Sequence, residues 1–283
     1  MKRFALFVTN LFLFLSAFGQ IPVKLTGVVV DEHRTPLPYV NIGIVGTTVG
    51  TVSGPDGTYT LHLSENVAGG DTLRFSMVGH KSCSYSLADF TKGIQTGNRV
   101  TLPKAAFNLQ EVVVRPRFSN KKLIGMMQKK TRRVTNFAIS KKPNQNLGAE
   151  IGRKFRLPKG GVHLDTFYFY VAQNNFDTVR FRINIYEIKK GKPARNIAPQ
   201  NIIVQLTEGQ TGWVKVDLTP FQLMVNEKVA IAAEWIYHSA TGRALAIPIA
   251  MPSAGVHFYK YGSQGKWKKF MGMSAAMRLQ VSF

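Results

Sequence analysis

The sequence predicts an all-β protein with two domains. Apolar and polar residues alternate with a period of two along many short runs, which is typical of half-buried strands. Turn-forming proline, glycine, aspartate and asparagine residues separate these runs at short intervals. With 283 residues, the chain is long enough to bury two separate cores.

Residues 1–19 have the pattern of a secretory signal peptide. Two basic residues precede a mostly apolar run to Phe18, and small residues at Ala17 and Gly19 suit cleavage before Gln20. We therefore expect an exported protein in the periplasm or associated with the outer membrane. An N-terminal membrane anchor is the alternative. No later stretch predicts a transmembrane helix in the mature chain, so any membrane contact would be peripheral.

The first domain is expected over residues 20–115, organised around the stretch from Leu25 to Leu63. Its turns contain Thr35-Pro36-Leu37-Pro38 and Gly54-Pro55-Asp56-Gly57. In such turns proline fixes φ, aspartate bonds the local backbone and glycine accepts a positive φ. The alternating run that follows, residues 58–64, predicts a half-buried strand.

These motifs, together with Thr26-Gly27-Val28-Val29-Val30-Asp31 and Tyr39-Val40-Asn41-Ile42, resemble the carboxypeptidase regulatory-like domain over residues of about 21–115. The resemblance implies a seven-stranded, transthyretin-like Greek-key sandwich of the kind that occurs in Bacteroidota envelope proteins. It also implies an accessory role, because this module accompanies other domains. We expect Leu109–Val114 to be its closing strand.

Residues 116–145 are predicted to form a basic linker, with a short helix as a variant. The net charge of +22 is concentrated around it, since residues 116–160 hold 13 lysines and arginines against one carboxylate. Three interpretations stay open: a solvated linker, a surface for anionic envelope components such as lipid A phosphates, or a helix docked on a sandwich. The candidate residues of an anion-binding surface are Lys121, Lys122, Lys129, Lys130, Arg132 and Arg133.

Residues 146–283 return to strand patterns, about nine in number, which predict a C-terminal β-sandwich of the jelly-roll type. The alternation is clearest in residues 179–186. There Val179, Phe181, Ile183 and Ile185 alternate with Arg180, Arg182, Asn184 and Tyr186.

Side chains with catalytic or metal-binding potential are scarce. His62 and Glu65 match the His-x-x-Glu spacing of zinc carboxypeptidases, but they lie in the accessory module, so we interpret the match as coincidence. The other histidines are isolated, and we expect neither a metal site nor a cofactor. Glu150, Glu187 and Glu234 lie in strand patterns and are expected at the surface rather than as a catalytic pair.

Trp267 is the aromatic residue whose context best suits ligand binding. Lys266, Lys268 and Lys269 flank it between glycine-rich turns, which predicts a partly exposed ring. Such a ring can stack on a sugar or contact an anionic surface. The other large aromatic residues of this domain are expected mainly in its core.

These observations favour an exported, non-catalytic envelope binding or assembly protein. A carbohydrate- or peptidoglycan-binding protein is the alternative, and a hydrolase is the third hypothesis. Nucleic acid is not an expected partner, because export separates the protein from it.

Overall fold

The computed structural model describes residues 24–64, 66–93, 99–105, 120–126, 131–139, 145–226 and 228–283. Within them the chain is all-β, as predicted, with α1 (Leu87–Gly93) and a short 3-10 turn, η2 (Thr219–Phe221), as the helical elements. None of these helical elements has the length and apolar character that crossing a bilayer requires. The expected signal peptide and the expected closing strand Leu109–Val114 lie outside the described residues.

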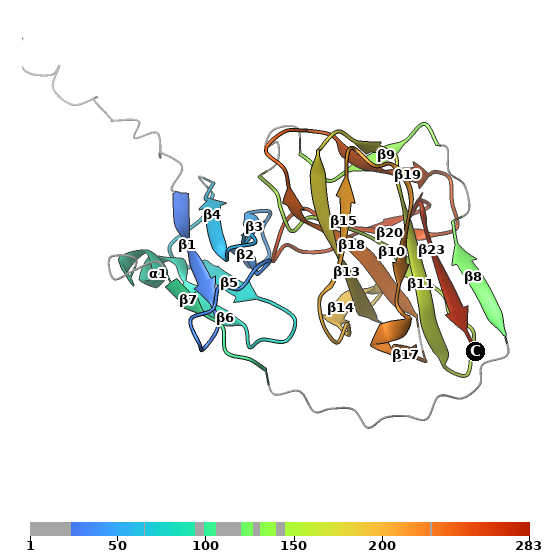
Figure 1. Cartoon of the computed structure of the whole chain (residues 1–283), viewed down its shortest axis with the longest axis horizontal. Helices are drawn as coiled ribbons and strands as arrows, with labels where there is room; N and C mark the ends of the chain where they lie inside the picture. The colour runs from blue at the N-terminus through green and yellow to red at the C-terminus, as the bar shows by residue number, and fades with distance from the viewer. Residues whose placement is uncertain are drawn as a thin grey trace, which may run out of the picture.

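The first domain contains two small sheets that share one core (Figure 1). One sheet has the order β4-β1-β7, with β1 and β7 parallel, and the other is antiparallel with the order β3-β2-β5-β6. Val29, Ile42 and Phe75 are fully buried in the core. The strands are β1 (Lys24–Val30), β2 (Asn41–Ile44), β3 (Gly50–Val52), β4 (Thr58–His62), β5 (Thr72–Ser76), β6 (Cys83–Ser86) and β7 (Arg99–Thr101).

Aspartate and glycine hold the predicted turns of this domain. Asp31 Oδ1 accepts two backbone hydrogen bonds within its turn, each of 2.8 Å. Asp56 Oδ1 accepts hydrogen bonds from the backbone nitrogen and hydroxyl of Thr58, at 3.1 and 2.7 Å. Gly57 between them has a φ of 76°, which glycine adopts without strain.

The second domain packs larger sheets around one extensive core that includes Phe167, Phe181 and Trp235. The main sheet has the order β14-β13-β18-β10-β20-β21, and β15 also pairs with β13. A second sheet has the order β16-β11-β23-β8, with β17 paired to β11, and a third has the order β12-β19-β22, with β9 paired to β19. The strands are β8 (Lys121–Gly125), β9 (Val134–Asn136), β10 (Glu150–Phe155), β11 (Val162–Val171), β12 (Gln173–Asn174), β13 (Thr178–Lys189), β14 (Lys192–Asn196), β15 (Ile202–Thr207), β16 (Gly212–Asp217), β17 (Met224–Val225), β18 (Val229–His238), β19 (Leu245–Ala250), β20 (Val256–Lys260), β21 (Lys268–Met271), β22 (Ser274–Ala275) and β23 (Met277–Ser282).

The expectation that residues 116–145 are a linker or a helix is wrong where the structure describes them. β8 pairs with β23 at the edge of the second sandwich, and β9 pairs with β19. Pairing with β23 satisfies the backbone groups along one side of β8, and Ile124 packs against the core, whereas Lys121 and Lys122 stay exposed. Lysines on an edge strand discourage further pairing, so a basic strand at this position is physically reasonable.

Candidate binding site

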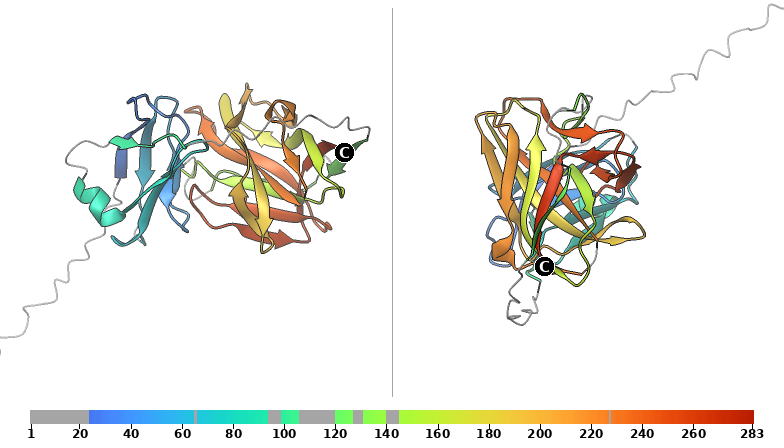
Figure 2. Two further views of the ribbon diagram at one scale, coloured as in Figure 1. Left: turned by 90° about the horizontal axis from the view of Figure 1, so that it is seen from below. Right: turned by 90° about the vertical axis from the view of Figure 1, so that its right-hand side faces the viewer.

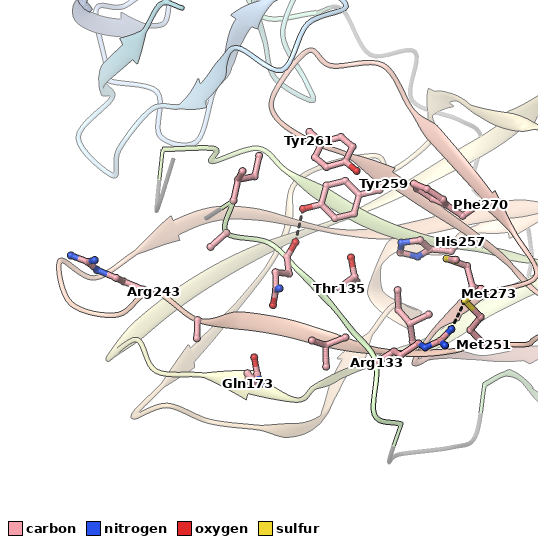
Figure 3. A pocket seen from close by; sticks show the side chains of 16 residues that line it. Arg133, Thr135, Gln173, Arg243, Met251, His257, Tyr259, Tyr261, Phe270 and Met273 are labelled. Atoms are coloured by element: carbon pink, nitrogen blue, oxygen red, sulfur yellow. Dashed lines mark hydrogen bonds between the residues drawn. The ribbon is translucent and has the colours of Figure 1, made fainter. Parts of the chain in front are cut away.

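A cavity of about 840 Å³ opens in the second domain beside the β9–β19 pair and the β20–β21 hairpin (Figure 3). Its lining comes from residues 133–139, 243–251 and 257–273, and from Gln173 on β12. Small-molecule sites commonly have volumes of about 300 to 1,000 Å³. We name it the aromatic cavity because four rings line it: His257, Tyr259, Tyr261 and Phe270.

The four rings belong to β20, β21 and the turn between these strands. The ring centroids of Tyr259 and Tyr261 are 4.3 Å apart, and those of His257 and Phe270 are 5.7 Å apart. The Tyr259 hydroxyl donates a hydrogen bond of 2.5 Å to the carbonyl of Asn136, which links β20 to β9 (Figure 3). This hydrogen bond therefore holds the aromatic strand β20 in place against β9.

His257 supplies a ring nitrogen to this lining. The residue is 2 % exposed, and its Nδ1 has no hydrogen-bond partner among the described residues. Burial lowers the pKa of His257 to about 4, so the imidazole is neutral at pH 7. A neutral imidazole has one donor and one acceptor nitrogen, so it can hydrogen-bond to a polar ligand.

Two arginines provide the charge of the aromatic cavity. Arg243 and Arg133 lie toward opposite ends (Figure 3), and Arg133 Nη1 donates to Met251 Sδ, a weak acceptor, at 2.7 Å. No ion pair within the described part of the chain engages either guanidinium. No aspartate or glutamate is among the described residues that line the cavity, so its field is positive.

Two carboxylates expected at the surface are instead fully buried. Glu150 and Glu234 face each other across β10 and β18, and each has an exposed fraction of 0 %. Asn184 Nδ2 donates to both, at 3.2 Å to Glu150 and 2.7 Å to Glu234. Glu187 is exposed as expected, where it pairs with Arg195.

Buried cations compensate these carboxylates. Arg182 Nε donates to Glu234 Oε2 at 2.8 Å, and Lys260 Nζ forms an ion pair with Glu150. The Tyr186 hydroxyl donates to Glu150 Oε2 at 2.8 Å. We call these side chains, together with Asn184, the charged cluster.

The two carboxylates of the charged cluster have pKa values displaced in opposite directions. Burial raises the pKa of Glu150. Burial acts in the same direction on Glu234, but the adjacent Arg182 guanidinium outweighs it and lowers that pKa. Such a divergence can mark an acid–base pair. Neither carboxylate lines the aromatic cavity or a second, smaller cavity of the same domain, so a substrate in either cavity would not contact them.

The first domain covers the Arg182 end of the charged cluster. Arg182 Nη1 donates to the Tyr39 carbonyl at 2.7 Å, and the Arg180 guanidinium lies 5.8 Å from the Tyr39 ring centroid. Tyr39 has a φ of 60°, which is uncommon for an aromatic residue. Tyr39 and Val52 also pack on Ile236 of β18, and Figure 1 shows β2 and β3 on the side that faces the second domain.

The turn between β20 and β21 packs on the β2–β3 hairpin. Gln264 Nε2 donates to Ser76 Oγ at 2.6 Å, and the Gly46 nitrogen donates to the Gln264 carbonyl at 2.9 Å. A Cβ atom at Gly50 would lie 2.5 Å from the Ser263 carbonyl oxygen, so this approach requires glycine. The two domains therefore meet in one continuous interface, seen from below in Figure 2.

Trp267 lies outside the aromatic cavity, on the outer face of the main sheet. It is partly exposed, as predicted, and its ring centroid is 5.4 Å from that of Tyr186 and 6.2 Å from that of Phe258. Lys260 Nζ lies 5.3 Å from the Trp267 centroid. One of the flanking lysines reaches a residue of the aromatic cavity, since Lys268 Nζ lies 4.9 Å from the Tyr261 ring centroid. The flanking lysines are all exposed: Lys266, Lys268 and Lys269.

The structure separates the residues predicted to form one anion-binding surface. Lys121 and Lys122 are exposed on β8, Arg132 is exposed in the loop before β9, and Arg133 lines the aromatic cavity. Lys129 and Lys130 lie outside the described residues. The aromatic cavity itself was missed from the sequence, because its lining comes from distant strands without a shared motif.

The His-x-x-Glu match gains no support as a metal site. His62 is exposed at the end of β4, and Glu65 lies outside the described residues. The described part of the chain places no group of three His, Cys, Asp or Glu side chains so that they could hold a metal ion.

Comparisons with solved structures find distant similarities. The cysteine protease and lectin-like domains of Cwp84, a surface layer associated protein of Clostridium difficile, match at 10 % identity and a TM-score of 0.38, over 47 % of this chain and 32 % of that one. A variant of the clostridial cysteine protease Cwp84 after propeptide cleavage matches at 10 % identity and a TM-score of 0.42, over 94 % and 73 %. The chain thus spans about a third of the first structure, and TM-scores this low carry no argument about function.

No curated protein sequence matches the chain. The sequence profile of one domain family does match, over residues 25–114. This stretch includes the two small sheets described above, and it agrees with the resemblance that its turn motifs suggest. Over these residues the chain is accordingly similar to the CarboxypepD_reg-like domain.

Proposed function

We propose that the chain is an exported, non-catalytic binding protein of the cell envelope, whose aromatic cavity holds a glycan. The observation that carries the proposal is the aromatic cavity itself, which combines two adjacent tyrosine rings with polar groups at a ligand-sized volume. Sugars present apolar C–H faces and hydroxyl groups. Aromatic rings suit the former, and Arg133, Gln173 and His257 suit the latter.

A binding role is favoured over hydrolysis by the lining of the cavity. Glycoside hydrolysis ordinarily needs two carboxyl groups that flank the scissile bond. The described lining offers none, and the carboxylates of the charged cluster are fully buried. The CarboxypepD_reg-like domain is consistent with this, since it adds a β-sandwich module rather than catalytic side chains.

The test is calorimetric titration of the mature chain with a panel of neutral and acidic oligosaccharides. We expect at least one to bind, and we expect Tyr261→Ala and Phe270→Ala to weaken that binding about tenfold each, equal to about 1.4 kcal/mol. Tyr85→Ala is the matched control, because Tyr85 is a part-exposed tyrosine of the first domain. If no oligosaccharide bound at millimolar concentration, or if the cavity variants bound like the control, the proposal would fail.

Export and contact with anionic envelope components complete the proposal. N-terminal sequencing of the protein from its native host should start at or near Gln20, and a retained Met1 would contradict export. Lys121 and Lys122 are exposed on an edge strand, within the most basic part of the chain. Co-sedimentation with anionic vesicles should weaken as salt rises and should fall on Lys121→Gln/Lys122→Gln substitution. Equal binding to neutral vesicles would remove this contact from the proposal.

A further inference from the structure

A second, smaller cavity of about 270 Å³ lies at another edge of the second domain. It is bounded by β8, by the end of β10 and by the loop before β20, and none of its lining residues lines the aromatic cavity. Its volume is just below that of typical small-molecule sites, about 300 to 1,000 Å³, and so suits one compact group.

Arg153 is the unusual residue of this second cavity. Its Nη1 donates to the Ala275 carbonyl at 3.1 Å, whereas its buried Nε has no partner among the described residues. Burial lowers the pKa of Arg153 to about 10. No carboxylate in the described part of the chain forms an ion pair with it. A buried charge without a counter-ion is costly, so a ligand anion would supply what the chain does not.

The neighbours of Arg153 increase the positive potential. Lys154 and Arg156 also line the second cavity. Burial lowers the pKa of Lys154, and repulsion from Lys228, Arg156 and Lys269 lowers it further. Lys154 and Arg156 repel each other, and no carboxylate is among the described lining residues, so the rim of the second cavity has a positive potential that attracts anions.

The loop that closes the second cavity adds a hydroxyl group. Ser253 lines the cavity, and its Oγ donates to Ser274 Oγ at 2.9 Å. A Cβ atom at Gly255 would lie 1.7 Å from Ser274 Oγ, so the loop can approach β22 only with glycine at that position. The loop therefore forms a fixed wall of the second cavity.

We propose that the second cavity is a binding site for a tetrahedral oxyanion, a phosphate or sulfate group, with Arg153 as the principal donor. The planar guanidinium presents several N–H donors that match such an anion. Lys154 and Arg156 contribute charge at the rim. The group could arrive as the free ion or as the ester of a sugar, and both carry the same oxygens to the same donors.

The experiment titrates the mature chain with inorganic phosphate, inorganic sulfate and glucose 6-phosphate, at ionic strength held constant with chloride. Phosphate or sulfate is expected to raise the melting temperature above that in chloride. Arg153→Met should weaken binding about tenfold or more, and Arg156→Gln should weaken it several-fold. Lys189→Gln is the matched control, since it removes one exposed cation outside the cavity.

Circular dichroism checks whether the Arg153→Met variant folds. If that variant does not fold, Arg156→Gln provides the test of the proposal, because Arg156 is exposed and its substitution should not disturb the fold. Tighter binding of glucose 6-phosphate than of inorganic phosphate would assign the group to a sugar, and equal affinity would assign the free ion. The proposal is overturned if phosphate and sulfate act no differently from chloride, or if Arg156→Gln binds like the lysine control. Glycan binding in the aromatic cavity could fail without affecting any of these results.

Discussion

The two faces of the main sheet are both buried, but by different chemistry. The inner face carries Phe181, Ile183 and Trp235 into the large apolar core. The outer face carries Arg182, Glu234 and the rest of the charged cluster, whose Arg182 end lies beneath the first domain. The comparison teaches that alternation along a strand reports the polarity of each face and not its exposure.

The energetic risk also differs between the faces. An apolar face tolerates a lost methylene group at a graded cost, because the neighbours partly relax. A buried ionic face depends on every partner, because removal of one leaves an uncompensated charge.

Glu234→Gln should destabilise the chain by about 3 to 5 kcal/mol, because it leaves the buried Arg182 without its ion-pair partner. Phe181→Ala on the inner face should cost a similar amount, about 3 to 5 kcal/mol, through the cavity that it creates. Urea unfolding of both variants gives the comparison. The double variant Arg182→Met/Glu234→Leu should recover part of the loss, and a Glu234→Gln cost below about 1 kcal/mol would remove the contrast.

The two faces should respond to acid in different pH windows. The pKa of His257 on the inner face is lowered from 6.5 to about 4, so protonation favours the unfolded chain. Stability should be unaffected above pH 6.5 and should fall by about 3 kcal/mol between pH 6.5 and 4. The pKa of Glu234 on the outer face is lowered from 4.5, so its contribution is retained above that pH and lost below it.

Unfolding free energies measured across the acid range separate the two terms. His257→Leu should remove the fall of about 3 kcal/mol that His257 contributes between pH 6.5 and 4, and it should leave the loss at lower pH. If His257→Leu left the pH profile of the unfolding free energy unchanged, the loss of stability between pH 6.5 and 4 could not be assigned to His257 on the inner face.

Gly50→Ala should loosen the contact that keeps the outer face covered. The added methyl group meets the Ser263 carbonyl, and overpacking of this kind costs about 1 to 3 kcal/mol. Calorimetry should show the first domain melting earlier and apart from the second. Gly70→Ala is the control, since a Cβ atom there has no neighbour within 4 Å. Identical melting of the two variants would mean that this contact does not couple the domains.

Glu187→Gln should have the smallest effect. Glu187 lies on β13, as Arg182 does, but its ion pair with Arg195 is exposed, with side-chain exposures of 47 % and 73 %. Water screens such a pair, so the change in unfolding free energy should lie within measurement error. A loss as large as that of Glu234→Gln would show that burial does not distinguish the two pairs.

Local sequence patterns predicted individual strands and turns well, but they did not predict contacts between residues that are distant in the sequence. The Pro55-Asp56-Gly57 turn and the alternation in β13 identify a turn and a strand, since both depend on neighbours in the chain. Glu150 is buried among Asn184, Tyr186 and Lys260, which lie on other strands, and no local pattern reveals these contacts. The strand at residues 121–125 was missed because it begins with two lysines inside a basic stretch, although an edge position favours lysines.

The candidate site was predicted only in part, for a related reason. Trp267 was expected to be partly exposed, and it is, but the larger cavity is lined by Tyr259, Tyr261 and Phe270 instead. Arg133 was singled out for its charge and does line that cavity. A ligand site formed by several separate strands has no motif of fixed spacing in the sequence. The sequence can therefore indicate candidate residues, but it does not show which of them lie together in the fold.

The left-handed Tyr39 and its carbonyl contact with Arg182 limit how this protein can have been assembled from modules. A domain that is exchanged between proteins normally has its own core, and the neighbouring domain folds without specific contacts to it. Here the incoming module must also present one backbone carbonyl to a buried guanidinium and a bare glycine to Ser263. Exchange for another module of the same fold would leave a buried N–H of Arg182 without the Tyr39 acceptor, so the two halves are expected to have been inherited as a single unit.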